Sequence, residues 1–354
     1  MTAARARPAS SRRGTGRGRG RLAALALAGI ATLLLSIAAA IAIGPADIAL
    51  TDVYAVIGQH LGLGDAGLSR IREGIVWELR LPRTLLAAVC GAGLALCGAI
   101  LQSLLRNPLA DPFVLGISSG ASTGAVLVIV AGLGGSAIGL SSGAFAGALV
   151  AFALVLALAA LAGGGTERVV LAGVAGTQLF AALTSFVVFS SADAEQTRGV
   201  MFWLLGSLSG AGWSDVALCA AVCGAGLLLC MTQTTALDAL AFGEDTASAL
   251  GVEVGRVRVL LLVVTALLTA VLVSAAGAIG FVGLALPHAA RMLVGPLHRR
   301  LLPATALAGA IFLVWVDTAA RTLFAPQELP VGVVTALLGV PAFAAILARA
   351  GRRG

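Results

Sequence analysis

The strongest constraint on this chain is a series of apolar runs, each close to 20 residues long, that follow one another from Leu22 almost to the C-terminal end. A helical run of about 20 residues is long enough to cross the hydrocarbon core of a bilayer. The sequence therefore predicts an all-α polytopic membrane protein with about ten transmembrane helices. The runs lie near residues 22–43, 84–105, 113–132, 141–162, 168–190, 213–231, 257–276, 281–297, 303–322 and 331–350.

The composition supports a membrane protein independently of the count of runs. Of the 354 residues, 59% are hydrophobic and only 11% are charged, whereas soluble chains carry about 25% charged residues. So few charges could not cover the surface of a water-soluble chain. The eighth run is short and begins in a glycine-rich stretch, 277–283, so we expect it to be broken or partly re-entrant.

Arginine placement sets the expected orientation, because cytoplasmic loops of membrane proteins carry an excess of basic residues. Seven arginines lie in residues 1–21, a segment too poor in apolar residues to fold alone. We interpret it as a disordered cytoplasmic tail; a nucleic-acid-binding arm is the alternative, and no nucleic-acid partner is expected. The remaining arginines place both termini in the cytoplasm, with residues 22–350 as the transmembrane domain.

The sequence around Arg12 and Arg13 also resembles a twin-arginine export signal. However, the apolar run that follows is about 20 residues long, whereas a cleaved signal has an apolar core of about 7–15 residues. The first run is therefore interpreted as a retained span.

Residues 232–256 form the longest cytoplasmic loop after the tail, and they predict two short helices. Gly243 and Gly251 follow the two helical pieces, as expected for a residue that favours helix C-termini. Glu244 opens the second piece, where a carboxylate favours the helix N-terminus. The residues alone leave two interpretations open: a docking surface for a cytoplasmic partner, or an amphipathic stretch on the membrane surface.

The acidic residue Asp317 lies inside an apolar run, four residues before Arg321. This spacing places both on one helix face and predicts a structural ion pair. A proton relay is the alternative for an acid within a membrane.

The chain lacks the residues that ATP hydrolysis or covalent catalysis requires. A phosphate-binding loop needs a lysine, and the sequence contains none. The three histidines, His60, His288 and His298, lie far apart and do not suggest a catalytic or metal-binding group. We therefore expect no enzymatic activity, no cofactor and no resident metal.

Motifs spread over residues 20–350 resemble the FecCD-type permeases that import iron–siderophore complexes and cobalamin. They occur in order and with similar spacing. They are Arg80-Leu-Pro-Arg83, Gln102, Arg106-Asn-Pro-Leu-Ala-Asp-Pro112, Leu115-Gly-Ile-Ser-Ser-Gly-Ala121, Trp203-Leu-Leu-Gly-Ser207, Gly243-Glu244 with Leu250-Gly251, Gly280-Phe-Val-Gly-Leu-Ala-Leu-Pro-His288, Arg291, Asp317, Arg321, Glu328-Leu-Pro-Val-Gly332 and Gly339-Val-Pro341.

The resemblance implies the fold of a type II ATP-binding-cassette (ABC) importer permease, with ten helices per subunit and a dimer that encloses the translocation path. It also implies that residues 232–256 form a coupling loop, which contacts one of two cytoplasmic ATPase subunits. The coupling residues implied are Gly243, Glu244, Ala247, Leu250 and Gly251.

On the outer face, the resemblance implies that Arg80, Arg83 and Arg321 pair with glutamates of an extracytoplasmic substrate-binding protein. Such charge pairs orient a partner and speed its encounter. For Arg80 and Arg83, anchoring of the second span is the alternative.

On the inner face, Asn107, Pro108 and Pro112 predict a fixed loop near the ATPase, since proline disfavours helix in the residue before it. A simple tight turn is the alternative. Residues 163–167 resemble the inner gate region, but their glycines and Glu167 depart from the family pattern, so no gate residue is assigned.

Together these features predict a multi-pass permease in the plasma membrane of a bacterium, surrounded by lipid. The expected cargo is a ferric siderophore or a similar metal chelate, with cobalamin or haem as alternatives. The second permease subunit is either another copy of this chain or a related chain. An ion-coupled secondary transporter is the alternative from another class, and it would place an ion site at the bilayer midplane.

Overall fold

The computed structural model describes residues 14–351 except 45, 47, 65–66, 133–136 and 192. Helices are the only regular elements among these described residues, which confirms the predicted all-α class. The ten principal helices are α1 (Gly14–Ala42), α4 (Leu81–Leu104), α5 (Ile117–Val130), α6 (Ala137–Leu161), α7 (Thr166–Ser191), α9 (Trp213–Thr232), α12 (Val254–Ala276), α13 (Val282–Val294), α14 (His298–Thr322) and α15 (Val331–Gly351).

Shorter helices connect the ten principal ones at both ends of the molecule. Two of them, α10 and α11, lie where the sequence predicts two helical pieces, whereas α2 and α8 were not predicted. The short elements are α2 (Leu50–His60), α3 (Arg70–Gly74), the π-helical turn η1 (Ile75–Arg80), the 3₁₀ turn η2 (Pro112–Leu115), α8 (Ala194–Leu204), α10 (Thr234–Leu240) and α11 (Glu244–Ala249).

The predicted count of ten apolar helices agrees with the structure. Within the described part of the chain, seven helices are long and apolar enough to cross a membrane, and three shorter apolar helices, in α5, α13 and α15, accompany them. Several boundaries differ from the prediction: α14 begins at His298 instead of residue 303, and α1 begins at Gly14 instead of Leu22. A helix extends readily once it is nucleated, and no proline interrupts residues 14–21. The rest of the predicted tail, residues 1–13, lies outside the described residues.

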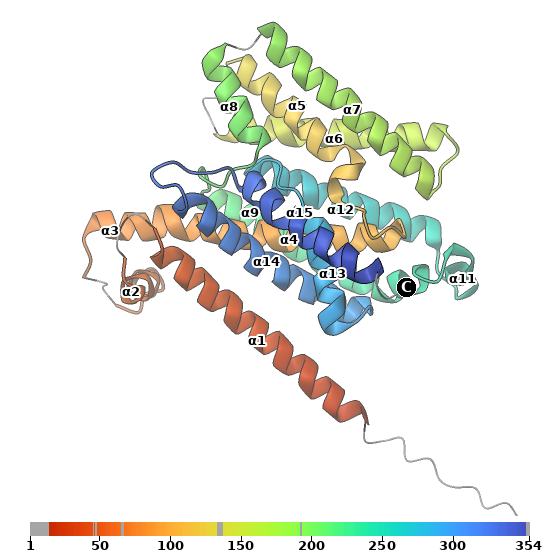
Figure 1. The fold of residues 1–354 in the computed structure, drawn as a ribbon, viewed down its shortest axis with the longest axis horizontal. Helices are drawn as coiled ribbons and strands as arrows, with labels where there is room; N and C mark the ends of the chain where they lie inside the picture. The colour runs from red at the N-terminus through yellow and green to blue at the C-terminus, as the bar shows by residue number, and fades with distance from the viewer. Residues whose placement is uncertain are drawn as a thin grey trace, which may run out of the picture.

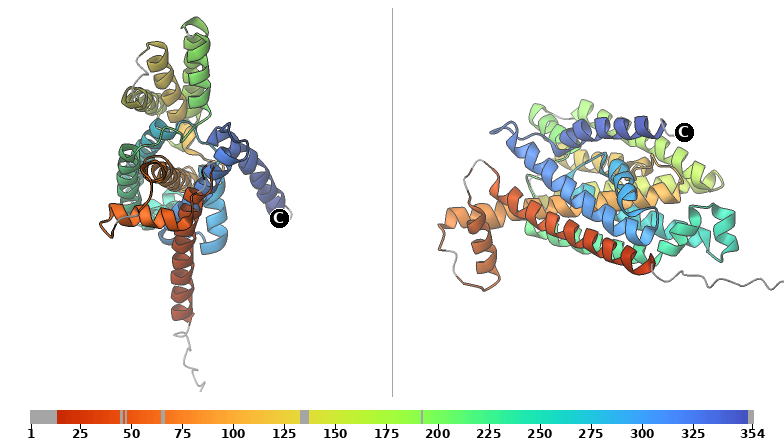
Figure 2. Two further views of the ribbon diagram at one scale, coloured as in Figure 1. Left: turned by 90° about the vertical axis from the view of Figure 1, so that its left-hand side faces the viewer. Right: turned by 60° about the horizontal axis from the view of Figure 1, so that its bottom comes forward.

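The helices form two layers. In the first layer, α4 lies at the centre and packs against α9, α12, α13 and α14 (Figure 1). In the second layer, at the top of Figure 1, α5, α6 and α7 pack on one another and meet the first layer mainly through α12. Helix α1 lies against α14 and projects away from the rest of the bundle (Figure 2).

Glycines permit the closest helix contacts. A Cβ atom added to Gly91 of α4 would lie 2.1 Å from the carbonyl oxygen of Gly309 in α14, and one on Gly124 would lie 2.0 Å from that of Gly143. Neither position tolerates even a methyl group. Helices in a membrane associate through such close packing, because lipid tails are as apolar as the helix surfaces and the hydrophobic effect does not drive the helices together.

Two of the apolar helices, α5 and α13, are short because the chain enters each of them after an irregular segment. Before α13, Gly277 (φ 69°) and Phe281 (φ 67°) take left-handed backbone conformations. A Cβ atom on Gly283, near the start of α13, would lie 2.8 Å from Pro112 of η2. The two irregular segments therefore meet inside the bundle, and the expectation that the eighth run is broken is confirmed.

Candidate functional site

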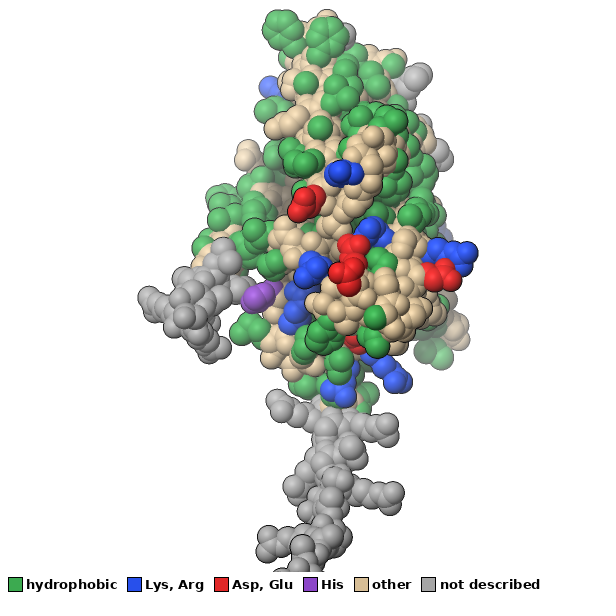
Figure 3. Space-filling view, turned by 90° about the vertical axis from the view of Figure 1, so that its right-hand side faces the viewer, with side chains coloured by type: hydrophobic (Ala, Val, Ile, Leu, Met, Phe, Trp, Pro, Cys, Tyr) green, Lys and Arg blue, Asp and Glu red, His purple; other side chains and the backbone are tan. Residues whose placement is uncertain are grey.

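The sequence predicts that the end of the molecule that carries α11 is the inner end, and polar residues gather there around α10 and α11. Figure 3 shows this end: arginine and acidic side chains lie over its lower part, while the α5–α7 layer above is largely hydrophobic. Gly243, at φ 111°, starts α11 in a conformation that other residues rarely adopt. The side chain of Ala247 is fully buried beneath α11, whereas Leu250 is 69% exposed and Phe242 is 77% exposed.

Glu244 ties α11 to the neighbouring spans. Its carboxylate forms an ion pair with Arg258 of α12. The hydroxyl of Thr166, at the start of α7, donates to the same carboxylate at 3.5 Å. The loop that precedes α7 resembles the inner gate region, so Glu244 connects the predicted coupling loop to that region and to α12.

A hydrogen-bonded chain that the sequence did not predict holds α10 to the bundle. The backbone N–H of His298, at the start of α14, donates to Asp238 of α10 at 2.9 Å, and its ring Nδ1 lies 2.6 Å from the same oxygen. The ring Nε2 lies 2.6 Å from the hydroxyl of Ser103 in α4. A single buried imidazole of α14 therefore joins the predicted coupling loop to α4. The sequence feature that could have indicated these hydrogen bonds is a histidine at the inner end of a predicted span.

The inner-face loop between α4 and α5 is held by its own side chains. The carboxamide oxygen of Asn107 accepts from the backbone N–H of Leu109 at 2.9 Å, and Asp111 accepts from Phe113 at 3.0 Å. Because Pro108 and Pro112 interrupt the helical pattern, this segment is ordered but not α-helical.

On the outer face, Arg80 is buried and bonds to backbone. Its guanidinium donates to the carbonyl oxygens of Ile41 at 2.7 Å, Ala42 at 3.2 Å and Ala46 at 2.8 Å. The last carbonyls of a helix have no partner within it, so Arg80 satisfies the C-terminal end of α1.

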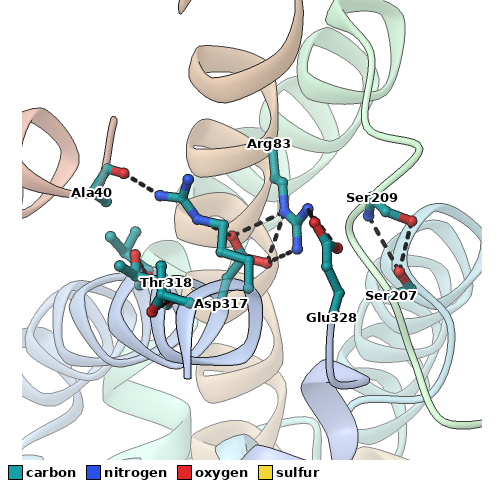
Figure 4. Close-up of polar contacts among 10 residues, drawn as sticks. Ala40, Arg83, Ser207, Ser209, Asp317, Thr318 and Glu328 are labelled. Atoms are coloured by element: carbon teal, nitrogen blue, oxygen red, sulfur yellow. Dashed lines mark hydrogen bonds and ion pairs between the residues drawn. The ribbon is translucent and has the colours of Figure 1, made fainter. Parts of the chain in front are cut away.

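Arg83 is the centre of the outer charge cluster (Figure 4). It donates to Asp317 at 2.9–3.1 Å and to Glu328 at 2.9 and 3.0 Å. Arg321 lies farther from Asp317, at 3.8 Å, and donates to the carbonyl oxygen of Ala40. The closest partner of Asp317 is therefore Arg83 of α4, which sequence spacing did not reveal because the two residues lie in different helices.

The three arginines predicted to dock a binding protein share one cavity. It has a volume of about 390 Å³ and opens at the outer end of the bundle. The cluster brings together three guanidinium groups and two carboxylates and therefore carries a net positive charge. The cavity is lined by Ala46, Ile75, Leu79, Arg80, Arg83, Ser209, Ala211, Arg321, Ala325, Pro326 and Glu328.

The apolar helices of the described residues, ten in all, define a polytopic helical membrane protein with a positively charged cavity at one end. The model of the FecCD transport family matches residues 32–349, so the chain belongs to this family. The family assignment makes it a permease subunit of an ABC importer and a multi-pass protein of the cytoplasmic membrane. Membership implies a separate ATPase, a substrate-binding protein and a permease dimer, and it decides against a secondary transporter.

Individual relatives agree with the family assignment. The chain is 45% identical to the cobalamin import system permease protein BtuC of Halobacterium salinarum, over 84% of this chain and 78% of the relative. It is 40% identical to an uncharacterized ABC transporter permease, YvrB of Bacillus subtilis, over 92% and 94% of the two chains. Among solved structures, an inward-facing putative metal-chelate type ABC transporter matches with 30% identity and a TM-score of 0.81, over 92% and 99%.

We predict that Asp317→Ala destabilises the folded subunit by about 3–5 kcal/mol, because it removes the only carboxylate among the described residues that pairs with buried Arg321 and leaves Arg83 with Glu328 alone. Unfolding of the purified subunit in detergent measures the effect. The control is Glu253→Ala, which breaks an exposed pair with Arg256 and should change stability by no more than about 1 kcal/mol. Equal stability of the two variants would contradict the structural role of Asp317.

Proposed function

We propose that this chain is the permease subunit of a cobalamin importer. The observation that carries the proposal is the 45% identity to a cobalamin import permease over 84% of this chain. A second relative with the same named cargo, the vitamin B12 import permease BtuC of Salmonella typhi, is 42% identical over 83% of the chain. A relative's cargo is an argument by analogy, so uptake must be measured directly.

A ferric siderophore, the cargo expected from the sequence, is the second candidate. It is favoured by the solved relative described as a putative metal-chelate type transporter. Both cargoes are bulky metal complexes. The permease would carry either of them after delivery by an extracytoplasmic binding protein.

The proposed coupling surface consists of Gly243, Glu244, Ala247, Leu250 and Gly251, together with Phe242. Leu250 and Phe242 expose most of their apolar surface, and a docked ATPase subunit would bury it. Two ATPase subunits that approach each other on ATP binding would push on both loops. The bonds of Glu244 and Asp238 would pass this motion to α12, α7 and α14. ATP would thereby shift the population between outward-open and inward-open dimers.

The proposed docking surface for the binding protein is the outer cavity with its three arginines. The net positive charge of the cluster suits acidic side chains on the partner. Arg80 and Arg321 are held by the end of α1, so Arg83, which already binds the half-exposed Glu328, is the residue we expect to exchange partners. The importer would contain two permease subunits, either two copies of this chain or this chain and a relative.

The test of the cargo is uptake of radiolabelled cobalamin and labelled ferric siderophores in cells that lack this chain, with and without its restoration. We expect the deletion to abolish cobalamin uptake and the restored chain to rescue it, while siderophore uptake stays unchanged. Loss and rescue of siderophore uptake alone would overturn cobalamin in favour of the second candidate. Other importers for both cargoes must be deleted in the same strain.

We predict that Leu250→Arg lowers cargo uptake at least about tenfold, because loss of a buried interface anchor costs roughly 2 kcal/mol or more. The amount of permease in the membrane should not change, since Leu250 contacts solvent in the isolated chain. The matched control is Arg300→Ala, another exposed inner-face position. Normal uptake by the Leu250 variant would exclude this surface as the ATPase contact.

We predict opposite effects of two outer substitutions on binding of the substrate-binding protein to permease in nanodiscs. Arg83→Gln should weaken binding by removing the charge that attracts the partner. Glu328→Gln should strengthen binding and steepen its decline with salt, because it removes a competing carboxylate and raises the net positive charge. Thermal unfolding of both variants shows whether each is folded. Tighter binding by the Arg83 variant would refute docking at this cavity.

A further inference from the structure

The starting observation is the depth at which α5 and α13 begin. A Cβ atom on Gly173, in the inner half of α7, would lie 2.0 Å from the carbonyl oxygen of Val114 in η2. Gly116, just before α5, approaches the backbone of Thr177. At about 1.5 Å per residue, Thr177 lies roughly 16 Å from the start of α7. The irregular segment η2 is therefore deep within the thickness of the membrane.

The segment before α13 reaches the same region. Gly280 lies opposite the ring of Phe113, with 3.9 Å between an added Cβ atom and the ring edge. Non-helical backbone at membrane depth is stable only where protein buries it or where it lines a water-filled cavity. The two irregular segments are therefore either buried by protein or border a water-filled cavity.

A cavity of about 300 Å³ lies beside η2, between this turn and α7. It is lined by Phe113, Val114, Val174, Thr177 and Gln178. Gln178 lies in the middle of the 26-residue α7, and its neighbours on the exposed face of the helix are mostly apolar. Its side chain is exposed and, among the described residues, forms no hydrogen bond.

An unpaired carboxamide facing hydrocarbon is unfavourable by several kcal/mol. Gln178 therefore needs water or a polar partner at the bilayer centre. We propose that Gln178 faces the translocation path and forms hydrogen bonds with the cargo as it passes. This assignment rests on the importer function proposed above.

The chemistry of the side chain indicates the class of cargo that it would contact. A carboxamide offers two N–H donors and one acceptor and carries no charge. It suits a bulky metal complex with carboxamide or hydroxamate groups at its edge. Apart from Thr177, the rest of the rim is apolar and would let such a complex slide without tight binding. A carboxylate or guanidinium here would instead select cargo by charge.

The first test is thiol labelling of Gln178→Cys in the assembled importer, using a charged, membrane-impermeant reagent. The native cysteines do not interfere, because all five are buried and free. Leu179→Cys is the matched control: it lies at the same depth on an exposed part of α7 but does not line the cavity. We expect the first variant to react in at least one nucleotide state and the second to stay unreactive.

The second test measures the rate of cobalamin uptake by Gln178→Leu and Gln178→Asn. We expect the leucine variant to slow uptake at least about tenfold and the asparagine variant to restore part of it. ATP hydrolysis and binding-protein docking should stay unchanged in both. These two readouts separate a cargo contact from a folding or coupling defect.

Two results would overturn the assignment. Absence of labelling of Gln178→Cys in every nucleotide state would place the side chain against lipid or against the second permease subunit. Normal uptake by Gln178→Leu would exclude contact with the cargo. If cobalamin is not the cargo, the unsubstituted importer will take up no cobalamin, whereas the labelling of Gln178→Cys will be unaffected. The cargo proposal and the assignment of Gln178 can therefore fail independently.

Discussion

Every backbone N–H and C=O group within the hydrocarbon must find a partner inside the protein, and the rest of this structure follows from that requirement. Uninterrupted helices meet it for most of the chain. The two broken segments, η2 and residues 277–281, meet part of it locally: the N–H of Phe113 donates to Asp111, and that of Gly277 donates to the carbonyl of Val273. The segments also pack on each other, which excludes lipid. Glycines make this burial possible: Gly98 and Gly283 bring α4 and α13 so close that an added methyl group would lie 1.9 Å from a carbonyl oxygen.

Sequence reasoning predicted the helices well, because hydrophobic length alone determines where a chain crosses a bilayer. The all-α class, the ten apolar helices and the break before α13 follow from composition and glycine content. The depth at which α5 and α13 begin did not follow. It depends on contacts such as that of Gly173 with Val114, which join segments far apart in the sequence.

The candidate sites were predicted less completely than the fold. The sequence paired Asp317 with Arg321, since local spacing can reveal only partners on one helix. The stronger bond, from Arg83, crosses between α4 and α14. The bond between Asp238 and His298 was missed for the same reason. Exposed positions such as Leu250 were found only through resemblance to a family, because exposure itself has no local sequence signal.

The arginines at the outer end of α1 have a mechanical consequence. Arg80 and Arg321 bind the last carbonyl groups of this helix, while only 22% of its apolar span is buried inside the subunit. Farther along the helix, Trp315 of α14 donates to Ser36 at 3.0 Å, and Gly29 packs on Leu307. Helix α1 is therefore fastened at its outer tip and along one side, so it braces α14 at the edge of the bundle.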